Sequence, residues 1–294
     1  MSVPVFRRVP ALRGAQWLVN AWYLFTRDAR AWMLFVLVLL GVMLLLAVIP
    51  LVGPLVFGLV FPIFCAGLAL AARAAERGEP MRVDQLFAGF RTAPGDLVAI
   101  GGFYLVGQVV VTAVMMGIGG AELESALAAA RKGAPPELTA GAGTSLLLAA
   151  AVGLALLMPL MLATWFAPLL VFFDRIRALP ALQVSLRAGL CNWRAFVVYA
   201  VGMLLALVLA RVVVVILSYV PVIGGMLATL VVGALLAVFA PVAFIAFYTS
   251  YVDVFAPLAI ESDADVPAEP DDAAGAQPDE TAGSSAGDGP PRAS

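Results

Sequence analysis

Residues 31–72, AWMLFVLVLLGVMLLLAVIPLVGPLVFGLVFPIFCAGLALAA, contain two long apolar runs on either side of a short turn. The first run, 31–49, holds no charged residue, and about 18 such residues are enough for a helix to cross roughly 30 Å of hydrocarbon. A spanning segment must pair its own backbone amides, which favours helix over open strand. Between the runs lie Pro50, Gly53 and Pro54, and proline ends a helix. The stretch therefore predicts two membrane-spanning helices joined as a hairpin.

The composition of the whole chain is that of a membrane protein. Of its 294 residues, 63% are hydrophobic and 12% are charged, whereas soluble domains are about 25% charged. Mean hydropathy is +1.03. Two cysteines are too few for a disulfide framework, so we expect Cys65 and Cys191 to be free thiols, with Cys65 packed.

The residues that commonly carry enzyme chemistry are scarce. Histidine is absent, which excludes histidine-based triads and histidine-ligated zinc sites. No phosphate-binding loop and no dinucleotide fingerprint occurs in the sequence. We therefore expect no catalytic, cofactor-binding or metal-binding residues, no cofactor and no enzymatic activity.

Apolar runs and basic stretches alternate along the chain in a pattern that indicates a threefold repeat. Basic amphipathic stretches at 11–30, 73–96 and 174–194 each precede a pair of spans, and the turns IPLVG (49–53) and VPVIG (220–224) are similar. We expect an all-α integral membrane protein of six transmembrane helices, arranged as three hairpins, each preceded by a basic amphipathic interfacial helix. The expected spans are about 31–49, 51–72, 97–118, 144–173, 195–217 and 226–251.

The membrane domain would cover 11–255. It would follow a flexible N-terminus, 1–10, and precede a disordered acidic tail, 256–294, whose Pro, Gly, Ala, Ser and acidic residues cannot bury enough apolar surface to fold. A connection at 119–143 is the only sizeable loop on its side of the membrane. Within it we expect a short helix at 121–132.

The first basic stretch predicts a helix in the membrane interface. Arg13, Gln16, Asn20 and Arg27 form a narrow polar stripe at helical spacing. Apolar side chains cover the rest, and we expect Trp17 to lie in the aromatic belt. The alternative is that this stretch is the cytoplasmic end of a long first span. In the third stretch, the residues expected to share an apolar face are Leu179, Leu182, Leu186 and Trp193.

Basic residues are shared unequally between the two sides of the membrane. Of the seventeen Lys and Arg, thirteen lie before the first span or in the loops from span two to three and from span four to five. Cytoplasmic loops carry such an excess, so we expect both termini to be cytoplasmic.

One basic residue, Arg211, lies inside a predicted span, where a charge at a helix centre costs about 2.5–3.5 kcal/mol. It is therefore a candidate functional residue. It also lies toward the outer end of the span, from which its side chain can reach the interface or meet Glu122 or Glu124, and we favour this structural interpretation.

Small residues spaced four apart would let helix backbones approach closely, within one chain or between copies. These candidate packing residues are Gly202, Ala206 and Ala210 in the fifth span and Gly225, Thr229, Gly233 and Ala237 in the sixth. Each hairpin also carries proline in its second span, and the candidate kinks are Pro62, Pro159, Pro168 and Pro241. The other polar groups well inside spans are Gln108, Thr112 and Thr164. Three polar residues are few for the lining of a pathway that carries a polar solute.

Three short motifs carry a resemblance to a known family: Phe61-Pro62-Ile63-Phe64, Arg77-Gly78-Glu79-Pro80 and Leu86-Phe87-Ala88-Gly89-Phe90. They resemble a family of uncharacterised bacterial multi-pass inner-membrane proteins, relatives of YciC-type proteins and of the membrane domain associated with some glycerophosphodiester phosphodiesterases. Residues 166–174, followed by 181–193 with its Asn192-Trp193 pair, are similar to the family's second recurring element. The resemblance covers roughly 11–255. It implies a helical fold in the bacterial inner (plasma) membrane, with no established activity to carry over.

These observations favour a non-enzymatic role in organising the membrane or binding partners. The expected partners are anionic lipid headgroups at the cytoplasmic face and either another membrane protein or a second copy of the chain; nucleic acid is not expected. The alternative is a small-solute or lipid transporter or channel, since discontinuous helices often mark transport sites. A polar cavity containing Gln108, Thr112 or Thr164 would favour transport, and a closed apolar bundle would favour the organising role.

Overall fold

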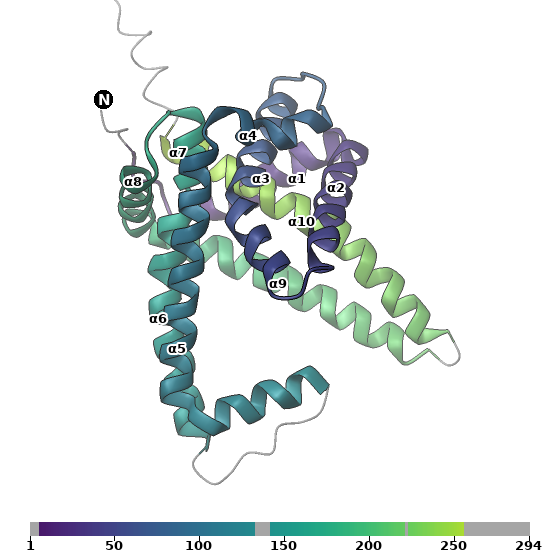
Figure 1. Cartoon of the computed structure of the whole chain (residues 1–294). Helices are drawn as coiled ribbons and strands as arrows, with labels where there is room; N and C mark the ends of the chain where they lie inside the picture. Colours follow the sequence, from purple (N-terminus) through teal and green to yellow (C-terminus); the bar gives the residue numbers. More distant parts are fainter. Residues whose placement is uncertain (1–5, 133–141, 221–222, 256–294) are drawn as a thin grey trace, which may run out of the picture. The chain divides into compact units, whose positions relative to one another are not determined.

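The structure is a computed structural model that describes residues 6–132, 142–220 and 223–255. Within these residues the chain forms ten α-helices, one 3₁₀-helix and no strand (Figure 1). The elements are α1 (Arg13–Arg27), α2 (Ala29–Ala47), α3 (Val52–Glu76), η1 (Val83–Phe87), α4 (Ala88–Thr92), α5 (Pro94–Lys132), α6 (Ala142–Trp165), α7 (Ala167–Phe173), α8 (Ala178–Cys191), α9 (Trp193–Ser218) and α10 (Gly224–Phe255). The predicted all-α class is confirmed.

Six segments of the described chain are long and apolar enough to cross a membrane. Their hydropathies lie between 2.1 and 2.8, and they are Ala29–Ala47, Val52–Glu76, Pro94–Ala129, Gly143–Phe173, Trp193–Ser218 and Gly225–Phe255. Spans that follow one another in the sequence are in contact: α2 with α3, α5 with α6, and α9 with α10. The chain is therefore a multi-pass transmembrane protein.

Backbone geometry separates the basic first helix from the first span. Asp28 leaves the helical region, with φ −149° and ψ 70°, and its carboxylate accepts a hydrogen bond from the Ala31 N–H at 3.1 Å. An aspartate in this position caps the start of a helix. Accordingly α1 and α2 are two helices, and the alternative of one long first span is not what the structure shows.

The turn between α2 and α3 depends on Leu51 and Gly53. Leu51 has a positive φ of 65°. A Cβ on Gly53 would lie 1.7 Å from the Leu46 carbonyl oxygen, so only glycine allows the two helices to meet so closely. The similar turn expected at 220–224 includes residues 221–222, which lie outside the described residues.

A sharp change of direction occurs within α5 at Gly120, whose φ is 51° and ψ is −142° (Figure 1). Helix continues from there to Lys132, which confirms the short helix expected at 121–132. The rest of that connection, 133–141, lies outside the described residues, as does the tail expected to be disordered, 256–294.

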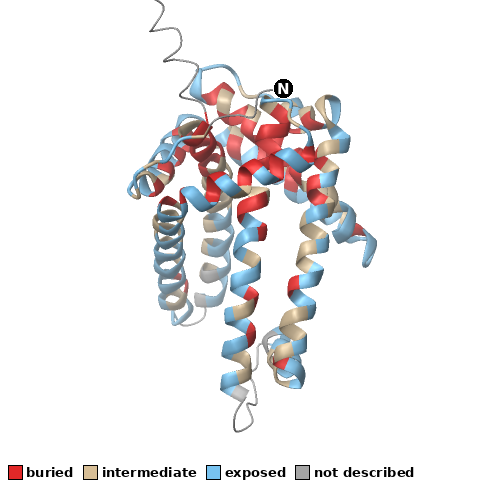
Figure 2. Cartoon of the chain, turned by 90° about the vertical axis from the view of Figure 1, so that its left-hand side faces the viewer, coloured by how far each residue is buried: buried red, intermediate tan, exposed pale blue. Residues whose placement is uncertain are grey.

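Burial is concentrated where α1, α7, α8 and η1 meet the first part of α2, the C-terminal half of α3, the start of α5 and the C-terminal end of α10 (Figure 2). We call this cluster the packed core. Its largest fully buried side chains are Trp17, Trp32, Phe35, Phe64, Phe166, Ile63, Leu68, Leu86, Leu97, Ile100, Leu169 and Leu170. Elsewhere the spans expose most of their apolar side chains, as expected for surfaces that face lipid or a partner.

The basic helix α1 packs into the core more deeply than the sequence indicated. Trp17, which we placed in the aromatic belt, is 1% exposed and lies against Phe196 and Tyr199 of α9. The reason is Gly14: a Cβ there would stand 2.0 Å from the Ala195 carbonyl oxygen, so glycine lets α1 approach α9. Trp22, by contrast, is 52% exposed.

The buried face of α8 consists mainly of small residues. Leu179 and Trp193 are 64% and 54% exposed, whereas Ala181, Ser185 and Ala188 are completely buried. Small side chains bring α8 close to α6 and α7, because large ones would hold the helices apart. Leu179 and Trp193 therefore lie outside the buried face, and the apolar face expected of Leu179, Leu182, Leu186 and Trp193 stays a prediction.

Candidate functional site

An intramembrane cavity of about 320 Å³ lies among the spans. Its walls come from α3, α5, α6, α7, α9 and α10. The lining residues are Gly58, Phe61, Pro62, Cys65, Ile100, Gly101, Tyr104, Met161, Thr164, Trp165, Pro168, Tyr199, Ala243, Phe244 and Phe247. We call this space the aromatic cavity.

Glycine and a helix break shape two sides of the aromatic cavity. A Cβ on Gly101 would lie 2.3 Å from the Leu59 carbonyl oxygen, so glycine sets the close approach of α5 to α3. On another side, α6 ends at Trp165 and α7 begins at Ala167, one residue before Pro168. Proline cannot donate a backbone hydrogen bond, which is why helix is interrupted beside it.

Ser185 of α8 satisfies the backbone at this break. Its Oγ accepts a hydrogen bond from the Phe166 N–H at 2.9 Å and donates one to the Leu162 carbonyl oxygen at 2.6 Å. The hydroxyl is completely buried. Because a buried unpaired amide is costly, this single side chain stabilises the interrupted helix that forms one wall of the cavity.

The wall is mostly aromatic and apolar. Trp165 contacts Tyr199 and Phe247 edge-on, with ring centroids 5.6 and 5.4 Å apart, and Phe61 meets Phe244 at 6.1 Å. Such edge-to-face arrangements are favourable geometries for aromatic pairs.

Two of the four hydroxyl and indole groups carried by the wall residues are already engaged. The Thr164 hydroxyl donates to the Leu160 carbonyl oxygen at 2.9 Å, and the Trp165 indole N–H donates to Ser250 Oγ at 3.1 Å. Within the described chain, the hydroxyls of Tyr104 and Tyr199 form no hydrogen bond. These two groups are therefore what the wall offers to a polar atom of a ligand.

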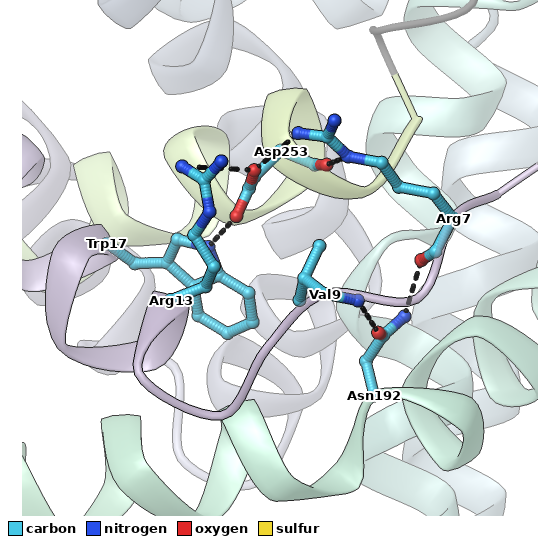
Figure 3. A network of polar contacts seen from close by, with 6 residues as sticks. All are labelled: Arg7, Val9, Arg13, Trp17, Asn192 and Asp253. Carbon is cyan, nitrogen blue, oxygen red and sulfur yellow. Dashed lines mark hydrogen bonds and ion pairs between the residues drawn. The ribbon is translucent and has the colours of Figure 1, made fainter.

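A second set of contacts, the polar layer, ties helix ends together around Asp253 of α10 (Figure 3). Arg7 donates to the Asp253 carboxylate at 2.8 Å, Trp17 Nε1 donates to it at 2.9 Å, and Arg13 lies 3.7 Å from it. The Asp253 side chain is only 10% exposed. One carboxylate thus joins α10 to α1 and to the segment that precedes α1.

Asn192, between α8 and α9, holds that same segment. Its Oδ1 accepts from the Val9 N–H at 2.8 Å, and its Nδ2 donates to the carbonyl oxygens of Arg7 at 3.1 Å and Ala188 at 2.9 Å (Figure 3). Residues 6–10 are the described part of the N-terminus 1–10 that was expected to be flexible. They make these bonds and the bond from the Arg7 N–H to the Val254 carbonyl oxygen, and the expected flexibility stays a prediction.

Two tyrosines of α10 complete the polar layer. The Tyr248 hydroxyl donates to Glu76 at 2.6 Å, and the Tyr251 hydroxyl donates to Asp174 at 2.7 Å. Partial burial raises the pKa of the Asp174 carboxyl above its ordinary value, and the hydrogen bond from Tyr251 opposes that rise. Both contacts connect α10 to the ends of the neighbouring spans, α3 and α7.

The residues singled out in the sequence are scattered. Arg211 is exposed and lines a separate hollow of about 190 Å³ between α9 and α10, away from the aromatic cavity. Within the described residues it makes no ion pair. Of the three polar groups proposed for a transport pathway, only Thr164 lines the aromatic cavity, since Gln108 and Thr112 are not among its residues.

The candidate packing glycines divide into two kinds. A Cβ on Gly202 would lie 2.8 Å from Leu18 Cδ1 of α1. A Cβ built on Gly225 or Gly233 would meet no heavy atom of the described chain within 4 Å beyond its chain neighbours and the nearby backbone of its own helix. The other candidate packing residues, spaced four apart along the same two helices, are Ala206, Ala210, Thr229 and Ala237. That these small residues contact a partner helix stays a prediction.

The candidate kink prolines also differ in place. Pro62, Pro159 and Pro241 lie inside continuous helices, whereas Pro168 lies just after the break between α6 and α7. Pro62 and Pro168 line the aromatic cavity. Their role as kinks stays a prediction.

Several residues of the cavity and of the polar layer could not be found from the sequence. Tyr104, Tyr199 and Trp165 are aromatic residues within three different apolar spans, and nothing in their spacing links them. The sequence did point to Asn192, because this residue belongs to the Asn192-Trp193 pair that carries part of the family resemblance. Asp253 is a single acidic residue just after the last expected span, 226–251, and such a position does not indicate its partners.

The thiols and the acidic groups offer little to a metal. Cys65 is buried and Cys191 exposed, and both are free, as expected. Among the described residues no group of three or more Cys, Asp or Glu is placed to hold a metal ion. The expectation that the protein has no cofactor and no catalytic residue stays a prediction.

Comparison with known proteins shows a similarity to an inner membrane protein. No protein-family model matches the chain, and no solved structure matches it. The chain is 28% identical over 196 residues to a Burkholderia thailandensis protein named "probable inner membrane protein". The aligned region covers 65% of this chain and 72% of the relative. Together with six membrane-length helices, this similarity fits a multi-pass membrane protein.

Proposed function

We propose that this protein is a non-enzymatic component of the bacterial inner membrane that organises or binds other membrane components. In this proposal it is related to YciC-type proteins and to the membrane domain associated with glycerophosphodiester phosphodiesterases. Its six spans are three hairpins, each preceded by a basic helix. The relative named as an inner membrane protein supports the location.

The observation that carries the proposal is the unequal burial of the spans. In α3, 56% of the most apolar window is buried in the protein, but in α9 only 6% is buried. An apolar helix with so few fully buried residues presents much of its surface to lipid or to another protein, although its N-terminal half packs against α1. The rows of small residues in α9 and α10 would allow a partner helix to approach closely.

Charge supports a cytoplasmic position for the packed core and for both termini. The basic residues at this end include Arg27 on α1, Arg73 on α3 and Arg187 on α8. Cytoplasmic flanks of spans are enriched in Lys and Arg. Many of these side chains are exposed, among them Arg27, Arg77, Arg82, Arg91, Arg175, Arg177, Arg187 and Arg194. Each Lys or Arg near an anionic surface contributes about 1 kcal/mol to attraction, so anionic headgroups are the proposed lipid partners.

A second function, lipid transport, is favoured by the aromatic cavity, because it lies within the spans and is mainly apolar. Transport of a polar solute has less support: Thr164 does line the cavity, but its hydroxyl is engaged with Leu160.

Purification of the full chain in mild detergent, with identification of co-purifying proteins and lipids, tests the proposed function. We expect a defined membrane-protein partner or a second copy, together with anionic lipid. The same preparation in liposomes should show no solute flux. Flux with no partner would contradict the organising role and favour transport.

A further inference from the structure

We propose that the aromatic cavity binds one hydrocarbon chain, the acyl chain of a membrane phospholipid, which enters from the bilayer. Every wall residue belongs to one of the six membrane-length segments. The medium next to this cavity is therefore lipid hydrocarbon. The inference does not depend on the partner-binding role, since an organising protein and a transporter could both hold such a chain.

The chemistry of the wall favours hydrocarbon over water. A buried water needs two to four polar partners. The hydroxyl of Thr164 and the indole N–H of Trp165 are engaged within the protein, which leaves the hydroxyls of Tyr104 and Tyr199. Two hydroxyl groups cannot hydrate the whole space, but an apolar chain needs no polar partner at all.

The size and rigidity of the cavity also fit a chain. Ligand pockets have volumes of about 300–1,000 Å³, and the cavity, at about 320 Å³, lies at the lower end of that range. Met161 of the wall is 39% exposed, so the cavity reaches the outer surface of the spans, which suits a chain whose other end remains in the bilayer. The contacts of Trp165 with Tyr199 and Phe247 brace one wall, and the close approach at Gly101 fixes another.

The tyrosine hydroxyls favour an acyl chain over a pure hydrocarbon such as a polyisoprenoid. An acyl chain begins at an ester, whose carbonyl oxygen accepts hydrogen bonds, and a phenolic hydroxyl donates them. A polyisoprenoid chain carries no such acceptor along its length. Tyr104 on α5 and Tyr199 on α9 are the donors that this difference would use.

Photocrosslinking of the full chain in phospholipid vesicles tests the proposal. The probe is a phosphatidylethanolamine with a diazirine in the middle of one acyl chain, and mass spectrometry locates the adducts. We expect adducts on wall residues such as Phe61, Tyr104 and Phe244, in competition with unlabelled phospholipid. Adducts confined to lipid-exposed residues such as Leu204 would overturn the proposal.

A matched pair of variants on α10 separates the cavity from general lipid contact. Ala243→Phe places a ring in the cavity, whereas Ala234→Phe adds the same ring at an exposed position of the same helix. Wall adducts should fall about tenfold in Ala243→Phe, equivalent to about 1.4 kcal/mol, and stay unchanged in Ala234→Phe. Unchanged wall adducts in a folded Ala243→Phe protein would contradict the proposal. If Ala243→Phe does not fold, Thr164→Phe fills the same space from α6 and should give the same fall.

Two further experiments distinguish a phospholipid acyl chain from a polyisoprenoid chain and from water in the cavity. A polyisoprenol carrying the same diazirine should give few wall adducts, and stronger labelling by it than by the phospholipid would overturn the acyl assignment. A water-soluble maleimide should modify exposed Cys191 but not Cys65, which lines the cavity. Modification of both thiols at similar rates would show a water-filled cavity and would also overturn the proposal.

Discussion

The packed core and the outer helix pair, α9 with the first half of α10, are almost equally apolar but differ in packing. The most apolar windows of α3 and α9 have hydropathies of 2.4 and 2.8, yet 56% of the first and 6% of the second are buried. Hydrophobicity therefore does not determine which span packs in the protein. In lipid the hydrophobic effect gives helices little reason to associate, so close backbone approach and polar contacts decide.

Glycines illustrate the difference. In the packed core, a Cβ on Gly67 would lie 2.3 Å from the Leu86 carbonyl oxygen. In the outer helix pair, a Cβ on Gly233 would meet no heavy atom of the described chain within 4 Å beyond its chain neighbours and the nearby backbone of its own helix. The same residue type is a packing requirement in one region and is free of contacts in the other.

The largest expected effect is that of Gly67→Ala. The new methyl would collide with backbone atoms of η1, which cannot move aside as a side chain can, and such overpacking costs about 1–3 kcal/mol or more. Thermal unfolding in detergent should show a clear loss of stability. Gly233→Ala is the matched control and should change the free energy of unfolding by no more than about 0.5 kcal/mol. Equal losses in the two variants would contradict the difference between the regions.

Asp253→Ala should have the next largest effect. It leaves the Trp17 indole N–H buried without its acceptor, and an unpaired buried donor costs about 1–3 kcal/mol. The ion pairs with Arg7 and Arg13 add less, because both arginines are more than 40% exposed. Chemical unfolding in detergent measures the loss. Adding Trp17→Phe to Asp253→Ala should restore part of it, and no recovery would show that the indole bond is unimportant.

Asn192→Leu should act locally. It removes the bonds to Val9 and Arg7 that hold the segment before α1. Trypsin should then cleave after Arg7 or Arg8 faster than in the unaltered protein, at an otherwise similar unfolding temperature. Ser218→Ala, which removes an exposed hydroxyl bond within α9, is a control that should leave this cleavage rate unchanged. An unchanged rate in Asn192→Leu would mean that other contacts hold the segment.

Arg211→Leu should have the smallest effect. Arg211 is exposed and makes no ion pair with the described residues, so its loss should change stability by less than about 0.5 kcal/mol. The recovery of a co-purifying partner should also be unchanged. If the variant folds normally but loses its partner, Arg211 is functional and the structural interpretation is wrong.

Much of the helical framework follows from the sequence, because long apolar runs and short turns determine it. The six membrane-length segments and the helix after Gly120 could be predicted in this way. Which faces pack could not be predicted, since protein-facing and lipid-facing side chains are alike. Leu68 in α3 is 2% exposed and Leu204 in α9 is 61% exposed, yet the two are the same residue type in equally apolar surroundings.

The candidate site was harder to predict than the fold. Thr164 was noticed as a polar residue in a span, but the aromatic cavity brings together residues from six helices whose sequence positions show no common pattern. The polar layer joins Arg7 to Asp253, 246 positions apart. Only the folded arrangement of the helix ends brings these two residues together.

The most direct test of the proposed role places a photoactivatable amino acid in the outer helix pair of the full chain and crosslinks it in native membranes. Leu209 of α9 is 58% exposed and carries the probe, and Leu37 of α2, 63% exposed, carries it in a matched control. We predict a discrete protein adduct, with another membrane protein or with a second copy, from position 209 but not from position 37. Lipid adducts alone from position 209, together with solute flux in liposomes, would contradict the partner-binding role.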